Sequence, residues 1–267
     1  MDSTFLKWAG GKTWFIRKHA DLFPTEYKRY IDPFLGGGAV YFYLEPSKAI
    51  VNDINTELIT TFKAIQDDWK SVETALKKHA KNHSDEYYYK VRGMAPQRPY
   101  TIAARMIYLN RTCFNGIYRV NRQGEFNVPK GSKNTVLLPT DKFEERSMIM
   151  KGTKFINEDF EKIINMAKKD DLLFCDPPYA VQDEDNRFVG YTKNLFDWDD
   201  QIRLALAIDR ARKKGVKIIL TNVNHPAVCA LYDKNHYILM DDTRFSSLSG
   251  QATGRLQYKE LIVTANL

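Results

Sequence analysis

The segment 171–180, DLLFCDPPYA, ends an apolar run with an acid, two prolines and a tyrosine. Proline fixes φ and has no N–H, so Asp176, Pro177 and Pro178 present oxygen acceptors in a rigid turn. A carboxylate and a prolyl carbonyl can together accept both protons of the exocyclic amine of a nucleobase. Tyr179 can stack on the same base and hold it in line with a methyl donor. These four residues are candidate catalytic residues, and the alternative is a turn whose Asp176 caps the next helix.

A second candidate site lies in YIDPFLGGGAV, where glycines 36–38 follow a predicted strand and precede a predicted helix. Glycine lets the backbone turn sharply and lets a ligand approach the helix N-terminus. Asp53 follows Gly36 at close to the ~20-residue offset at which an acid accepts hydrogen bonds from ribose hydroxyls. Gly36 and Asp53 therefore predict an adenosine-containing cofactor. The alternative for Asp53 is a cap on the helix that begins near Asn55.

The N-terminal segment FLKWAGGK adds an aromatic ring and a cation beside a glycine turn. Trp8 can stack on a ring or pack in the core, and Lys12 can reach a carboxylate or a phosphate. The spacing differs from the G-x-x-x-x-G-K-[ST] of a phosphate-binding loop, which argues against a kinase or an ATPase.

The elements that must position these residues alternate between short apolar runs and helical patterns, which predicts a parallel α/β sheet with helices on both faces. Asp197 and Gly215 are the predicted N-cap and C-terminal glycine of one such helix. The buried stripe expected on that helix consists of Trp198, Ile202, Ala205 and Leu206. The predicted strands are 30–34, 49–55, 171–179 and 216–224, with helices in 39–45, 57–65 and 225–233.

This alternation breaks between residues 68 and 140, which contain an amphipathic helix at 101–112 and the turn-rich NGIYRVNRQGEFNVPKGSKN. We expect an inserted, smaller and mainly helical domain that carries a β-hairpin with Gly124 at positive φ. The remaining residues, 1–67 and 141–267, form the predicted cofactor-binding domain.

The composition favours a polyanion partner in a reducing compartment. The 267 residues carry a net charge of +7 with pI near 9.1, and the three cysteines lack metal-ligand spacing. The sequence shows neither a signal peptide nor the roughly 20 apolar residues of a membrane span, so we expect a cytoplasmic protein without metal or membrane partner.

The motifs in this order resemble the Dam-type DNA adenine-N6 methyltransferases of the D12 class. The matching segments are KWAGGK (7–12), DPFLGGGAV (32–40), NDIN (52–55), NGIYRVNRQGEFNVPKG (115–131) and DPPY (176–179), and the family's GDF appears as EDF (158–160). The resemblance implies a Rossmann-like fold, S-adenosylmethionine as methyl donor and a flipped adenine in a GATC-like site of double-stranded DNA. It also implies the cytoplasm of a bacterium or phage host, and it allows a partner nuclease.

The resemblance assigns residues to two binding roles. The cofactor contacts would be Trp8, Lys12, Gly36, Asp53, Phe160 and Asp176. The DNA contacts would be Lys7, Phe114, Asn115, Ile117, Arg119 and Pro129, with Arg119 able to pair with a guanine and Phe114 or Ile117 able to fill the opened base step.

Three alternatives stay open on the sequence. The acceptors of the Asp-Pro-Pro-Tyr segment bind the exocyclic amine, which several bases share, and do not by themselves select one ring. The amine at N4 of cytosine, or that of an RNA base, is therefore a second target class. A nucleic-acid-binding module without activity is another class, which the intact Asp176 disfavours. An NAD-dependent dehydrogenase is disfavoured by the glycine spacing and by the lack of a histidine in any motif.

Overall fold

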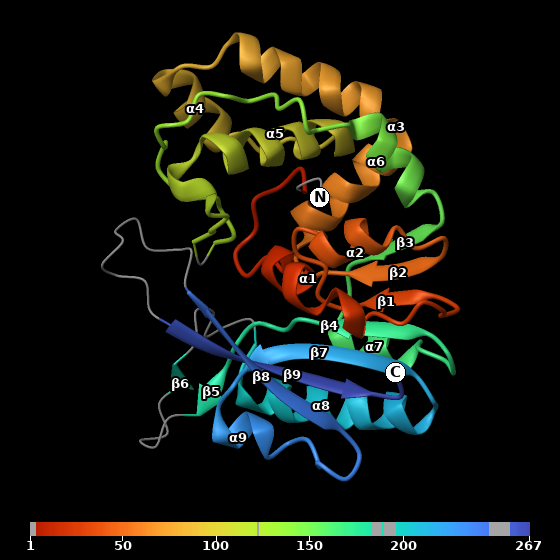
Figure 1. The fold of residues 1–267 in the computed structure, drawn as a ribbon. Helices are drawn as coiled ribbons and strands as arrows, with labels where there is room; N and C mark the ends of the chain where they lie inside the picture. The colour runs from red at the N-terminus through yellow and green to blue at the C-terminus, as the bar shows by residue number, and fades with distance from the viewer. Residues whose placement is uncertain (1–3, 122, 183–187, 190–195, 246–256) are drawn as a thin grey trace. The chain divides into compact units, whose positions relative to one another are not determined.

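The computed structural model describes residues 4–121, 123–182, 188–189, 196–245 and 257–267 (Figure 1). The chain forms two compact units, each assembled from three chain segments. The first unit contains residues 1–18, 36–47 and 55–157, and the second contains residues 19–35, 48–54 and 158–267.

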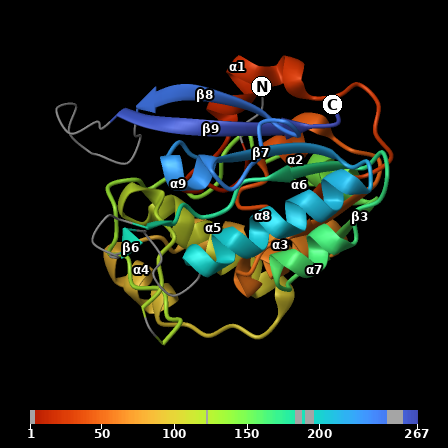
Figure 2. The ribbon, with the colours of Figure 1, turned by 90° about the horizontal axis from the view of Figure 1, so that it is seen from below.

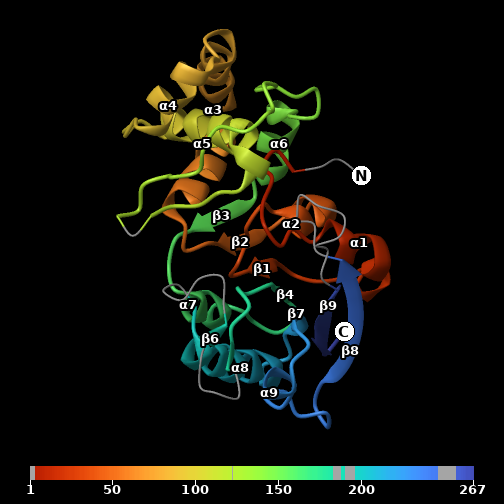
Figure 3. The same ribbon diagram turned by 90° about the vertical axis from the view of Figure 1, so that its left-hand side faces the viewer.

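The first unit is mainly helical, and its helices α3, α4, α5 and α6 pack on one another (Figure 3). Asn55 caps α3, because its side chain accepts a hydrogen bond from the amide of Leu58 at 3.0 Å. Asp68 interrupts α3 with a non-helical φ of −151°, at the boundary that the sequence predicts for the insertion. The elements are α1 (Thr13–His19), α2 (Ala39–Leu44), α3 (Thr56–Lys81), α4 (Asp85–Arg92), α5 (Pro99–Thr112), η2 (Phe114–Gly116), α6 (Phe143–Met150) and β3 (Thr153–Ile156).

Aromatic rings fill the core of the first unit. The Phe62 ring lies 5.0 Å from the ring of Phe5 and 5.5 Å from that of Phe155, centroid to centroid. The predicted helix at 101–112 corresponds to α5, which is buried along most of its length.

Among the described residues, the strands of the second unit form a sheet in the order β2-β1-β4-β7-β9-β8. β1, β2, β4 and β7 run parallel, which confirms the predicted α/β class, whereas β8 and β9 pair antiparallel at one edge, which the alternation did not predict. The strands of the second unit are β1 (Tyr30–Asp32), β2 (Ala49–Asn52), β4 (Leu172–Cys175), β7 (Lys217–Val223), β8 (Ile238–Phe245) and β9 (Gln257–Ala265), and a separate pair joins β5 (Val181–Gln182) to β6 (Phe188–Val189).

Helices of the second unit pack against its strands, and α7 and α8 lie side by side (Figure 2). Asp197 caps α8 as predicted, in a reciprocal capping box with Asp200, and Gly215 has the predicted positive φ, 79°. The predicted stripe is wrong for Ile202 and Leu206, which are exposed, whereas Ala205 is buried as predicted. The buried face contains Gln201, Leu204, Ala205, Ala207, Ile208 and Ala211. The helical elements are η1 (Ala20–Leu22), α7 (Phe160–Asn165), α8 (Trp198–Lys213) and α9 (Pro226–Cys229).

Two features discussed from the composition, the cysteines and membrane-spanning helices, can be compared with the structure. Cys113, Cys175 and Cys229 are free thiols. No helix in the described part of the chain has the length and apolar character needed to cross a bilayer.

Candidate active site

Three neighbouring parallel strands of the second unit each end at an acid. β1 ends at Asp32, while Asp53 directly follows β2 and Asp176 directly follows β4. Because β2, β1 and β4 are adjacent in the sheet, these acids gather at its carboxyl edge, where open α/β sheets bind ligands.

Asp32 is buried and holds the turn that leaves β1. It accepts hydrogen bonds from the hydroxyl of Tyr30 at 2.8 Å and from the amide of Phe34 at 3.0 Å. Burial raises the pKa of Asp32 from 3.8 to about 7 against the lowering effect of these hydrogen bonds, and the nearby charges of Asp176 and Asp53 raise it further. The pKa of Asp32 therefore responds to both of the other carboxyls. Asp32 is the first residue of the DPFLGGGAV segment, although it is not among the predicted site residues.

Neither capping alternative holds for the other two acids. Asn55, and not Asp53, caps α3. After Asp176 the chain passes through an extended turn into β5 without an intervening helix, so Asp176 is not a helix cap. Asp53 and Asp176 therefore stay candidate ligand contacts at the ends of β2 and β4.

Thr221 of β7 orients the Asp176 carboxylate. Its hydroxyl Oγ1 lies 2.9 Å from Asp176 Oδ1, and Thr221 is fully buried. Pro177 is buried and Pro178 is exposed, so the turn is anchored on one side and open to solvent on the other.

Tyr179 is anchored at the far end of its ring. Its hydroxyl donates to the carboxylate of Glu260 on β9, and Glu260 is fully buried. Behind the turn, the amide of Gln201 donates to the Ala180 carbonyl at 3.3 Å and accepts from the Asn222 amide at 3.0 Å. A buried polar network from α8, β7 and β9 therefore holds the DPPY turn, because hydrogen bonds are stronger in the low-dielectric interior than in water.

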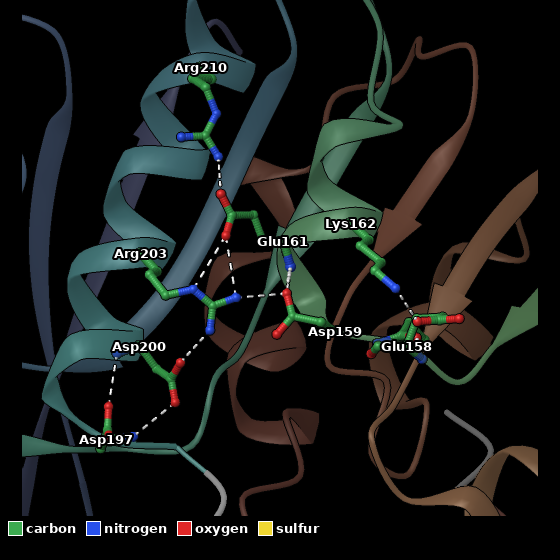
Figure 4. A network of polar contacts seen from close by, with 9 residues as sticks. Glu158, Asp159, Glu161, Lys162, Asp197, Asp200, Arg203 and Arg210 are labelled. Carbon is green, nitrogen blue, oxygen red and sulfur yellow. Dashed lines mark hydrogen bonds and ion pairs between the residues drawn. The ribbon is translucent and has the colours of Figure 1, made fainter.

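The EDF segment contributes a ring and a capped helix. Phe160 is buried against Phe34 and Phe196, with centroids 5.4 and 5.6 Å away. Asp159 caps α7 by accepting from the amide of Glu161 at 2.9 Å, and it accepts from the Arg203 guanidinium at 2.8 Å (Figure 4).

Glu158 stands where the family has glycine. Its side chain pairs with Lys162 on the surface at 2.7 Å, as Figure 4 shows, while its backbone exchanges two hydrogen bonds with the side chain of Asn52. The glutamate at this position therefore leaves the backbone of the turn hydrogen-bonded to Asn52.

In the first unit, Trp8 packs directly on the glycine turn. A Cβ atom built on Gly36, which has φ of 51°, would lie 2.8 Å from Trp8 Cδ1, and one built on Gly37 would lie 3.0 Å from Trp8 Cβ. Only glycine permits this approach. Lys12 is buried, with Nζ 3.2 Å from the carbonyl oxygen of Gly10.

The predicted DNA contacts cluster in the same unit. Asn110 of α5 bonds both backbone groups of Lys7, at 2.9 and 2.8 Å, and Lys7 Nζ donates to the carbonyl of Asn115. Phe114 is 55 % exposed, and its amide donates to the carbonyl of Pro129 at 2.9 Å. Lys7, Phe114, Asn115 and Pro129 are therefore brought together, with Ile117 half-buried nearby in sequence.

The predicted hairpin is present as a narrow loop with single bridges in place of regular strands. Val120 and Phe126 form an antiparallel bridge, and Gly124 has the predicted positive φ, 80°. Arg119 is exposed, and its Nε donates to Asn127 Oδ1 at 2.9 Å. Arg122 lies outside the described residues.

In the parts of the chain that the structure describes, no group of three or more His, Cys, Asp or Glu side chains is arranged to hold a metal ion. The arrangement in the second unit instead offers carboxylate and carbonyl acceptors and a tyrosine ring, which are suited to an amine and to hydroxyl donors.

Comparison with known proteins agrees with these motifs. The family model for the D12 class N6 adenine-specific DNA methyltransferases matches residues 8–246. The Type II methyltransferase M1.LlaDCHI of Lactococcus lactis subsp. cremoris is 34% identical, over 97% of this chain and 94% of that protein. The Type II methyltransferase M.MjaIII of Methanocaldococcus jannaschii is 37% identical over 82% and 83%, and the DNA adenine methylase of Haemophilus influenzae is 33% identical over 97% and 92%. The chain belongs to the D12 class of N6 adenine-specific DNA methyltransferases.

Proposed function

We propose that this protein transfers the methyl group of S-adenosylmethionine to N6 of an adenine flipped out of duplex DNA, at a short GATC-like site. The observation that carries the proposal is the set of acids at the ends of β1, β2 and β4, with the Asp176 carboxylate held by Thr221. Its place of action would be the cytoplasm, where its DNA substrate lies.

The residues of the chain fit the cofactor in their chemistry. Carboxylates such as Asp53 accept hydrogen bonds from ribose hydroxyls and attract the positive charge of a sulfonium, and Phe160 supplies a flat apolar surface. In the first unit, the close approach of Trp8 to Gly36 forms a turn without side-chain bulk, to which Lys12 adds a cation for a carboxylate. When bound, S-adenosylmethionine supplies an electrophilic methyl group.

The DPPY turn is proposed to act on the amine of the base. Asp176 and the carbonyl of Pro177 accept hydrogen bonds from the two N6–H groups, which draws the nitrogen toward sp³ character and localises its lone pair. One of the two protons is released from N6 when the nitrogen gains the methyl group. Tyr179 stacks on the adenine, and its hydroxyl bond to Glu260 limits rotation of the ring. The acceptors are positioned before the substrate binds, so they stabilise developing charge without reorganisation.

The 68–140 region, together with Lys7, is proposed to read the DNA. Extruding an adenine from the stack costs a few kcal/mol, and an exposed apolar side chain such as Phe114 can fill the opened step. Arg119 can pair with a guanine through two hydrogen bonds, and Lys7 can do so less rigidly. Asn115, Ile117 and Pro129 complete the proposed contact surface.

The decisive experiment incubates the purified protein with labelled S-adenosylmethionine and random-sequence duplex DNA, followed by mapping of the modified base. The proposal expects N6-methyladenine within one short sequence. Label on cytosine N4, or on RNA in preference to DNA, would assign the other amine-methylating class. Absence of transfer with retained DNA binding would assign a binding module without activity.

A further inference from the structure

Tyr118 lies in the 114–119 segment, which is proposed to contact the DNA bases, yet its ring packs on Trp8 of the KWAGGK segment (7–12). The Trp8 and Tyr118 rings are stacked, with centroids 5.5 Å apart and planes 26° from parallel. Phe126 closes the other side of the tyrosine edge-on, with its centroid 5.6 Å away. Trp8 therefore contacts the glycine turn at Gly36 and the 114–119 segment at Tyr118.

The hydroxyl of Tyr118 is anchored to the base of α3. It donates to Glu57 Oε2 at 2.7 Å, and Glu57 Oε1 accepts from the Arg105 guanidinium at 2.8 Å. Burial, followed by the Glu57 carboxylate, raises the pKa of Tyr118, so the hydroxyl stays protonated and remains a donor.

Arg105 makes this anchor rigid. The residue is 7 % exposed, and its remaining nitrogens donate to the backbone carbonyls of Val91 at 3.1 Å and Arg92 at 2.7 Å. Hydrogen bonds to ionised groups are the stronger class, so Glu57 is a fixed point. The Tyr118 ring is therefore held between Trp8 and Phe126, with its hydroxyl on Glu57.

We infer that Tyr118 is a positioning residue that couples base contacts made by the 114–119 segment to cofactor affinity through Trp8. The inference rests on the proposed function, in which Trp8 contacts S-adenosylmethionine and Phe114, Ile117 and Arg119 contact DNA. Coupling between two ligands is reciprocal, so cofactor binding also tightens the binding of the preferred duplex.

The test measures the dissociation constant of S-adenosylmethionine by calorimetry, without and with a saturating duplex that contains the mapped site. An inactive duplex, with the target adenine replaced by a purine that lacks the amine, prevents turnover. The ratio of the two constants reports the coupling, and we expect about five-fold or more for the unchanged protein.

Three variants separate the ring stack from mere occupancy of space. Tyr118→Ala removes the ring, and Tyr118→Leu fills much of the same volume without an aromatic face. Both are expected to bring the ratio close to one, while Tyr118→Phe keeps the stack and retains most of the ratio. In turnover assays the Ala and Leu variants are expected to raise KM for S-adenosylmethionine more than they lower kcat.

Tyr89→Ala is the matched control, because Tyr89 is a 47 % exposed tyrosine of the same unit. A wild-type ratio in both Tyr118→Ala and Tyr118→Leu overturns the inference, as does an equal loss in Tyr89→Ala. A ratio of one in the unchanged protein also overturns it. Failure of the proposed function is separate, because the unchanged protein would then bind no S-adenosylmethionine or transfer no methyl group to adenine.

Discussion

The hydroxyl of Thr221 lies 2.9 Å from a carboxylate oxygen of Asp176, so a side chain of β7 orients the acid that ends β4. Thr221 belongs to β7, and Asp176 directly follows β4, its parallel neighbour, in which Cys175 is the register partner of Leu220. Orientation of the proposed amine acceptor is therefore a property of the sheet as well as of the DPPY turn.

We predict that Thr221→Val lowers kcat about ten-fold, since a hydrogen bond to an ionised group is worth ~1.5 kcal/mol or more and this one sets the acceptor geometry. Binding of S-adenosylmethionine should change little. Steady-state kinetics with both substrates measures the effect. Thr264→Val, at a buried threonine of β9, is the control, and equal losses in the two variants would assign the effect to general destabilisation.

Tyr179→Phe is expected to reduce methyl transfer about ten-fold while it keeps the ring, because the hydroxyl that fixes the ring on Glu260 is lost. Glu260→Gln should have a similar effect. The double variant should be little worse than either single one, since residues that share a hydrogen bond give non-additive effects. Rates measured for all four proteins decide the point, and fully additive losses would show that the two residues act independently.

Asp32 is expected to make stability depend on pH. Its pKa rises from 3.8 to about 7 in the folded state, so the folded protein binds more protons than the unfolded chain between these values. The stabilising contribution of the protonated carboxyl is complete below pH 3.8 and is lost as the pH rises through about 7, by up to ~1.4 kcal/mol per pH unit.

The measurement is urea unfolding of the wild type and of Asp32→Asn between pH 4 and pH 8. The free energy of unfolding of the wild type should fall relative to that of the variant as the pH rises, because asparagine does not titrate. A difference between the two proteins that is constant across this range would contradict the raised pKa of Asp32.

Arg119→Ala should cost roughly 1 to 3 kcal/mol on the preferred site and relax the choice at one base pair. Lys133→Ala, at an exposed lysine of the same region, should weaken all sequences together and flatten the salt dependence of binding. Binding to duplexes with single-base substitutions separates these effects. A uniform loss on every duplex in the Arg119 variant would reduce Arg119 to a phosphate contact.

Much of the second unit could be predicted from local sequence. Apolar runs bounded by turn residues located β1, β2, β4 and β7, and the order of motifs placed Asp53 and Asp176 at strand ends. Capping chemistry located the start of α8 at Asp197. These features depend on neighbouring residues, so the sequence contains their signal.

The partners of the site residues could not be predicted in this way. Thr221 and Glu260 lie 45 and 81 residues from their partners Asp176 and Tyr179. Their side chains resemble ordinary strand residues until the pairing order of the sheet is known. Gln201 of α8 is buried although its side chain is polar, so polarity alone predicts it to be exposed. Its amide can be buried because it forms hydrogen bonds with Asn222 and Ala180.

In the first unit, the motif order implied roles for Trp8 and for the 115–131 segment separately. The stack of Trp8 on Tyr118 depends on the path of the 113–131 loop over α5, which contains short bridges and turns instead of a periodic pattern. A loop of this kind leaves little local signal for its tertiary contacts.

Single-turnover methylation by Asp176→Ala tests the central claim most directly, with S-adenosylmethionine and duplex DNA both bound at saturation. The claim is that the Asp176 carboxylate accepts a hydrogen bond from the adenine amine as the methyl group transfers. We predict a retained fold, retained binding of DNA and loss of methyl transfer by a factor of about 100 or more, with partial recovery in Asp176→Asn, whose carbonyl still accepts. A near-normal rate in the alanine variant would contradict the assignment of DPPY as the catalytic turn.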